Sequence, residues 1–168
     1  MNMDPQTALI VETTATMIGI FTGTILAFAV DKYNERQKKK KRAKILLRSI
    51  SKELRENFDA IQSARQEYMD TPWGKSFYIS SSAWDTAVAG GDLPDIIGFE
   101  LADCISAQYA LFVRIRYYVD LMTQLWLVPE TIPGYAEKRA GFHNAILESM
   151  NKVSENHRNV ISLVDQNL

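Results

Sequence analysis

Residues 8–30 read ALIVETTATMIGIFTGTILAFAV, and residues 31–44, which follow directly, read DKYNERQKKKKRAK. The first stretch has 23 residues, and as a helix it would measure roughly 34 Å, enough to cross a hydrocarbon core of about 30 Å. The second stretch holds eight Lys and Arg residues, whereas none precedes it. Because cytoplasmic flanks carry the excess of positive charge, the pattern predicts a single-pass transmembrane helix with residues 1–7 outside the cell membrane.

A cleavable signal peptide is the alternative, because Ala27-Phe28-Ala29 has the small-x-small form that signal peptidase cuts after. The charges oppose this alternative, since a signal peptide carries its positive residues before the apolar run. The sequence therefore favours an uncleaved anchor. Glu12 lies near the outer end of the anchor, where its carboxylate either reaches headgroup water or pairs with a polar group of a partner.

Small residues recur every four positions in the anchor, which places them on one face of the helix and lets another backbone approach closely. Gly19-Ile20-Phe21-Thr22-Gly23 is a GxxxG unit within this face. Nearby threonines, including Thr24, could add hydrogen bonds between helices. We expect the anchor to pack against another transmembrane helix through this surface, the anchor face. It consists of Ala15, Gly19, Gly23 and Ala27.

The basic juxtamembrane segment, residues 31–44, lies beside a predicted bilayer, and residues 45–168 carry a net charge of −5. Anionic lipid headgroups are therefore the expected polyanion, and nucleic acid is not an expected partner. The same residues also serve as a stop-transfer signal, which is compatible with lipid contact. The residues predicted to contact lipid are Lys38, Lys39, Lys40, Lys41, Arg42 and Lys44.

No Pro or Gly follows Val30 until Pro72 and Gly74, so the anchor is predicted to continue out of the membrane as one helix. Apolar residues at spacings of three, four and seven predict its buried face in the cytoplasm. They are Leu47, Ile50, Leu54, Phe58, Ile61 and Tyr68. Glu53 and Glu56 are predicted to lie outside this face, in solvent.

The remaining chain has the same helical periodicity and no long alternation of apolar and polar residues. A short helix is predicted over 82–89, capped by Ser81 or Ser82 and stopped by Gly90-Gly91. Two long helices follow, over about 98–127 and 134–163, with a start at Pro94 as the alternative for the first. The predicted fold is all-α: a transmembrane helix that continues into a cytoplasmic antiparallel bundle of three long helices and one short helix over residues 45–168.

The apolar positions of these two helices define the rest of the expected core. In the first they are Leu101, Ile105, Phe112, Val119, Met122 and Trp126. In the second they are Phe142, Ile146, Met150, Val153, Val160 and Val164.

Ser82-Ala83-Trp84-Asp85 leads to Gly90-Gly91-Asp92-Leu93, and the following helix carries Tyr109. With the basic helix after a transmembrane segment, these residues resemble a loose group of uncharacterised bacterial and archaeal single-pass membrane proteins. The resemblance implies a small cytoplasmic helical domain and transfers no activity. We expect Trp84 to fill one end of the bundle, a glycine to adopt positive φ and Asp92 to cap the turn.

Catalytic and metal-binding patterns are missing from the sequence. It has no Glu-x-x-His, no phosphate-binding glycine loop and no nucleophile elbow. His143 and His157 are fourteen residues apart, about 21 Å along one helix, too far to share an ion. Cys104 has no adjacent basic residue and is expected to be a buried, inert thiol. The chain is thus predicted to be no enzyme and to hold no metal or cofactor.

A basic and aromatic cluster in the helix predicted over about 98–127 is a possible partner patch, with snorkelling from the bundle surface as the alternative. It consists of Arg114, Arg116, Tyr117 and Tyr118. The leading hypothesis is a non-enzymatic accessory or regulatory subunit that docks onto a larger prokaryotic membrane protein complex. The rival is a homo-oligomeric membrane sensor or scaffold, and an enzyme of unknown type is a distant third.

Overall fold

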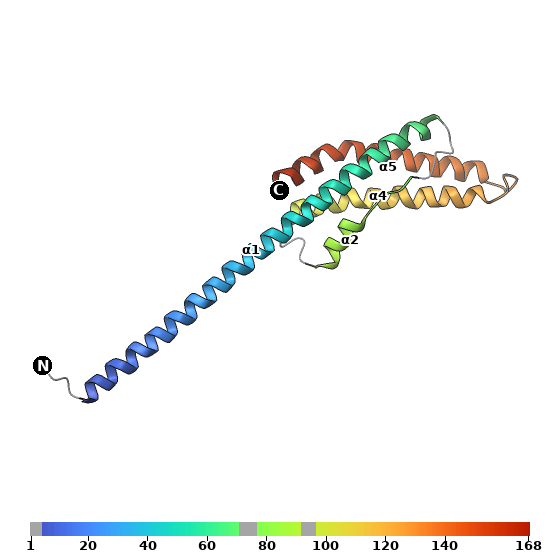
Figure 1. The fold of residues 1–168 in the computed structure, drawn as a ribbon. Coiled ribbons are helices and arrows are strands. Elements are labelled where there is room, and N and C mark those ends of the chain that lie inside the picture. Colours follow the sequence, from blue (N-terminus) through green and yellow to red (C-terminus); the bar gives the residue numbers. More distant parts are fainter. Residues whose placement is uncertain (1–4, 71–76, 92–96) are drawn as a thin grey trace. The chain divides into compact units, whose positions relative to one another are not determined.

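The computed structural model describes residues 5–70, 77–91 and 97–168, with side chains from Thr13 onward. Within these ranges the chain is all-α and has no strand (Figure 1). The helices are α1 (Pro5–Asp70), α2 (Ser82–Ala89), α4 (Phe99–Trp126) and α5 (Tyr135–Gln166). This confirms the prediction of three long helices and one short helix. The Glu12 side chain, the turn at Pro72 and Gly74, the Pro94 start and the Asp92 cap lie outside the described residues.

The chain divides into two compact units, Met1–Arg42 and Ala43–Leu168. Among the described residues, α1 is the one helix that is long and apolar enough to cross a membrane, and none of its apolar stretch is buried within the structure. Large apolar side chains such as Phe21 and Phe28 are 71% and 70% exposed. The first unit is therefore an apolar helix that buries none of this surface by itself.

The second unit, Ala43–Leu168, is a three-helix bundle with α2 on its side. In the contacts between α1 and α5, the residue numbers rise along α1 and fall along α5: Arg55 contacts Asp165, and Gln62 contacts Ser154. Along α4 and α5, Gln108 contacts Val153 and Tyr118 contacts Phe142. Helix α5 therefore runs antiparallel to both neighbours, which leaves α1 and α4 parallel.

The predicted core residues are buried except Phe58, Phe142 and Trp126, and Phe142 is half-buried. The three long helices supply Leu47, Ile50, Ile105, Phe112, Ile146 and Met150, among others. Phe58 is half-buried and packs against this core. The prediction for Trp126 is wrong: its side chain is 69% exposed, because it is the last residue of α4 and lies beyond the packed turns. Cys104 is half-buried against the core.

Glycines set three helix boundaries. Gly98 and Gly134 precede α4 and α5 with φ values of 85° and 79°, which only glycine adopts without strain. After α2, Gly91 has φ 71° whereas Gly90 stays right-handed. The predicted positive-φ stop is thus Gly91. Helix α5 ends at Gln166, three residues beyond the predicted end, because Val164 still packs into the core.

Candidate functional site

Glu53 on α1 is 5% exposed, so the prediction that this carboxylate lies in solvent is wrong. The cause is the N-terminus of α2, whose free N–H groups require acceptors and lie against this turn of α1. The N–H of Ala83 donates to Glu53 Oε2 at 3.0 Å and the N–H of Trp84 to Oε1 at 3.5 Å. Three hydroxyls also donate to the carboxylate: Ser80 Oγ at 2.6 Å, Ser82 Oγ at 3.0 Å and the Tyr109 hydroxyl at 2.5 Å.

The serine cap predicted for α2 is therefore replaced by a carboxylate from another helix. Ser81 occupies the N-cap position but makes no capping hydrogen bond with its side chain. Its hydroxyl donates to Asp85 instead, at 2.8 Å. Because a carboxylate at a helix N-terminus also interacts favourably with the helix dipole, Glu53 stabilises α2 more than a serine would.

Asn57, one turn after Glu53, fixes the residues that lead into α2. Its Nδ2 donates to the Ser80 carbonyl at 2.7 Å, and its Oδ1 accepts from the Ser80 N–H at 2.9 Å. The Asn57 side chain is 3% exposed. Two polar residues on one face of α1 thus hold α2 and its approach against the bundle.

The charge state of this network is set by its hydrogen bonds. Burial alone would raise the pKa of Glu53, but the hydrogen bonds from Ser80, Tyr109, Ala83 and Ser82 together bring this pKa below its ordinary value. Burial and the neighbouring Glu53 carboxylate raise the pKa of the Tyr109 hydroxyl. At neutral pH, Glu53 is therefore an anion and Tyr109 a neutral donor.

Trp84 extends this network into an aromatic stack. Its indole lies on the Tyr109 ring, with centroids 5.1 Å apart and an interplanar angle of 13°. Tyr109 in turn meets Phe112 edge to face at 5.5 Å. Trp84 is half-buried and packs on the side of the bundle, so the expectation that it fills one end of the bundle is wrong, and part of its side chain stays open.

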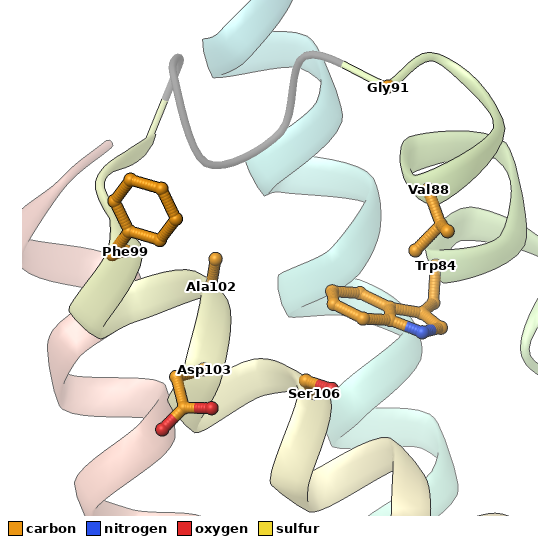
Figure 2. A pocket seen from close by; sticks show the side chains of 7 residues that line it. All are labelled: Trp84, Val88, Gly91, Phe99, Ala102, Asp103 and Ser106. Atoms are coloured by element: carbon orange, nitrogen blue, oxygen red, sulfur yellow. The ribbon is translucent and has the colours of Figure 1, made fainter.

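The open part of Trp84 lines a pocket of about 440 Å³ between α2 and α4. Figure 2 shows the indole projecting from α2 toward the facing side chains of α4. The lining residues are Trp84, Val88, Gly91, Phe99, Ala102, Asp103 and Ser106. A volume of this size falls in the range of about 300–1,000 Å³ found for small-molecule sites. The sequence pattern did not reveal this pocket, because its walls come from two helices and helical periodicity does not predict which helices touch.

Comparisons with protein-family models, with curated proteins and with solved structures find no match for this chain. The resemblance to a group of single-pass membrane proteins therefore stays a prediction.

The predicted anchor face is exposed throughout, at Ala15, Gly19, Gly23 and Ala27. A Cβ atom added at Gly19 or Gly23 would meet nothing within 4 Å, so the space over both glycines is open. Thr24 donates its hydroxyl hydrogen bond to the Ile20 carbonyl of its own helix at 2.8 Å. The residues predicted to contact lipid are exposed as well; they are Lys38, Lys39, Lys40, Lys41, Arg42 and Lys44.

The residues of the predicted partner patch differ in how far they pack against the bundle. Tyr118 is half-buried and packs near Phe142 of α5, with ring centroids 6.2 Å apart. The Arg114 guanidinium lies 5.8 Å from the Tyr118 ring, an arrangement that suits an arginine lying along the bundle surface. Tyr117 and Arg116 are exposed.

Both histidines lie at the edge of the core between α1 and α5. The His157 ring stacks on Phe58 with centroids 3.8 Å apart, and the His143 ring lies 6.2 Å from that of Tyr68. Burial lowers the pKa of both, assisted by Arg55 near His157 and Arg139 near His143, while Asp59 partly opposes the shift at His157. Among the described residues, no group of three or more His, Cys, Asp and Glu side chains could hold a metal ion.

Acidification is expected to destabilise the bundle. A histidine with a lowered pKa binds fewer protons in the folded chain than in the unfolded chain. Its contribution to stability is therefore complete above the unfolded pKa of about 6.5 and is lost as the pH falls toward the folded pKa. Urea unfolding at several pH values between about 8 and 5 measures this loss.

The variant His157→Phe keeps a ring against Phe58 and removes the titrating group. Its stability should depend less on pH over this interval, with the remainder due to His143. Equal pH dependence in the variant and the natural chain would contradict the assignment to His157.

Proposed function

We propose that this chain is a non-enzymatic accessory or regulatory subunit of a larger prokaryotic membrane protein complex. In this proposal residues 8–30 cross the cell membrane once, residues 1–7 lie outside and the bundle lies in the cytoplasm. The apolar stretch of α1, unburied within the structure, and the eight Lys and Arg residues after it support the anchor and its orientation. Exposed lysines at 38–41 would contact anionic headgroups, at roughly 1 kcal/mol each.

The observation that carries the docking role is the outer face of α4. Eight positions at spacings of three and four form one strip of α4, and only Asp103 among them is charged. They are Phe99, Asp103, Ser106, Ala110, Val113, Tyr117, Leu121 and Gln124. Leu121 is half-buried and the others are exposed, and charged residues border the strip at Glu100, Arg114, Arg116 and Asp120. Phe99, Val113 and Tyr117 are 78%, 50% and 58% exposed.

Helix α5 differs from the outer face of α4, because its exposed positions are rich in charged residues. They include Glu137, Lys138, Glu148, Lys152, Glu155 and Arg158. Helices that face water normally carry such charged residues, and a contiguous apolar strip is typical of a protein interface. The outer face of α4 is therefore the surface that we assign to the partner complex.

The test compares two glutamate substitutions on opposite sides of the bundle, with the full chain purified in mild detergent. Tyr117→Glu places a charge in the middle of the outer face of α4 and should remove a stoichiometric membrane partner from the purified sample. Asn156→Glu adds the same charge at an exposed position of α5 and should leave the partner bound. Recovery of this chain alone in its natural form, or equal recovery with both variants, would overturn the proposal.

A homo-oligomeric sensor or scaffold is the second candidate, favoured by the open space over Gly19 and Gly23. In this case Gly19→Ile combined with Gly23→Ile should abolish self-association in a membrane two-hybrid assay, because the added side chains separate the backbones. The matched control is Met17→Ile with Phe21→Ile, on the opposite side of the helix. An unchanged signal in the glycine double variant would exclude this candidate.

A further inference from the structure

We propose that the pocket between α2 and α4 binds a small organic cation, such as a substituted ammonium ion. The pocket shares Phe99, Asp103 and Ser106 with the outer face of α4, but the inference concerns a ligand site and does not require the docking function. Among the residues that line the pocket, the one ionisable side chain is that of Asp103. The remaining lining is aromatic or aliphatic apart from Ser106 and Gly91. A carboxylate beside an apolar cavity suits a ligand that is positively charged and has an apolar body.

The charges of the surrounding sequence favour a positively charged ligand. Between Lys75 and Arg114 the chain holds five carboxylates and no Lys, Arg or His. Glu100 lies in the first turn of α4, and Asp85 is close enough to raise the pKa of Tyr109 beneath the indole. The nearest basic residue along α4 is Arg114, eleven positions from Asp103, or about 16 Å along the axis. The charged side chains nearest to the pocket along α2 and the first turns of α4 are thus acidic, which favours a cation as the ligand.

Trp84 supplies the second element of recognition, an aromatic ring that is held in a fixed orientation. Tryptophan is the strongest of the aromatic side chains in attracting a cation to its ring. Its indole is supported by the Tyr109 ring, and the Tyr109 hydroxyl donates to the buried Glu53. Phe99, 78% exposed, borders the same pocket from α4 (Figure 2). The site is thus largely formed before a ligand arrives, which lowers the entropic cost of binding.

The test uses choline and its neutral isostere 3,3-dimethylbutan-1-ol as probes, which differ in charge and hardly in shape. The full chain is placed in phosphatidylglycerol nanodiscs, and the indole N–H signal of Trp84 is followed by NMR and assigned with Trp84→Phe. Choline should give a saturable shift with a Kd at least about tenfold lower than that of the neutral probe. No saturable shift, or equal affinity for both probes, would overturn the proposal.

Asp103→Asn removes the charge with little change of shape at an exposed position, and it should weaken choline binding by about tenfold. Asp120→Asn, a matched loss of charge elsewhere on α4, should change the Kd by less than about twofold. Equal effects of the two variants would show that the pocket does not recognise the cation.

Nanodiscs of phosphatidylcholine distinguish a free cation from a lipid headgroup. A headgroup that occupies the pocket shifts the Trp84 signal before choline is added, whereas a site for free cations needs the soluble probe. Either result supports the cation site and shows whether its ligand is a lipid headgroup or a free cation.

Discussion

Replacing Glu53 by alanine is expected to lower the free energy of unfolding by about 3 kcal/mol. The substitution leaves the Tyr109 hydroxyl and the N–H groups of Ala83 and Trp84 without their acceptor, and each buried unsatisfied group costs about 1–3 kcal/mol. Because these groups lie at the start of α2, the helix should also detach locally. Urea unfolding of the full chain in detergent, followed by circular dichroism, measures the loss.

Glu56→Ala is the matched control, since this residue lies one turn away in solvent. Its carboxylate is 3.7 Å from Lys52 Nζ, and both side chains are more than half exposed. Exposed pairs of this kind contribute about 0.3–0.5 kcal/mol. Similar losses for Glu53→Ala and Glu56→Ala would mean that the buried network does not stabilise the bundle.

A reporter that is active only in the cytoplasm, fused after Leu168, is expected to be fully active, and one that is active only outside the membrane is expected to be silent. Residues 31–44, directly after the anchor, hold eight Lys and Arg residues, and none lies in residues 1–30. Acidic residues such as Asp4 and Glu12 contribute little to orientation in either direction. Enzyme assays on cells that express each fusion measure the result.

The same two reporters fused before Met1 serve as the control and should give the reverse pattern. An outside-active reporter that works after Leu168 would mean that Ala27-Phe28-Ala29 is cleaved or that the anchor inserts in the opposite direction. Either result would require abandoning a cytoplasmic partner. The outer face of α4 would then be available to a partner outside the membrane.

Much of the fold could be predicted from the sequence because its signals are local. The spacing of Leu47, Ile50, Leu54 and Ile61 fixes the buried face of α1 without knowledge of any other helix. Gly91, Gly98 and Gly134 mark boundaries because glycine adopts a positive φ without strain. These features need no information about which helices touch.

The candidate site could not be predicted, because each of its parts depends on a contact between distant residues. Glu53 carries the same charge as Glu56 and lies three positions away, yet one is buried and the other exposed. What separates them is the N-terminus of α2, some thirty residues later in the chain. The prediction that Trp126 lies in the core is wrong for a related reason. Helical spacing assigns Trp126 to the core face, but the packed turns of α4 end before it. Local periodicity does not report where a neighbouring helix stops.

Helices α1 and α4 are parallel, and α5 is antiparallel to both. Because α5 packs against both, the bundle is completed only after α5 has been synthesised. α1 leaves the ribosome before α5, and Asp165, which binds Arg55, is made 110 residues after it. Asp165 lies 95 residues after Asp70, so at about 5–20 residues per second the apolar face of α1 lacks its partner helix for roughly 5–20 s. During that interval Leu47, Ile50 and Leu54 are open to chaperones, to the membrane surface and to other nascent chains. The bundle therefore remains incomplete until the last turns of α5 have been made, and ribosomes stalled before residue 160 should display a bundle sensitive to protease.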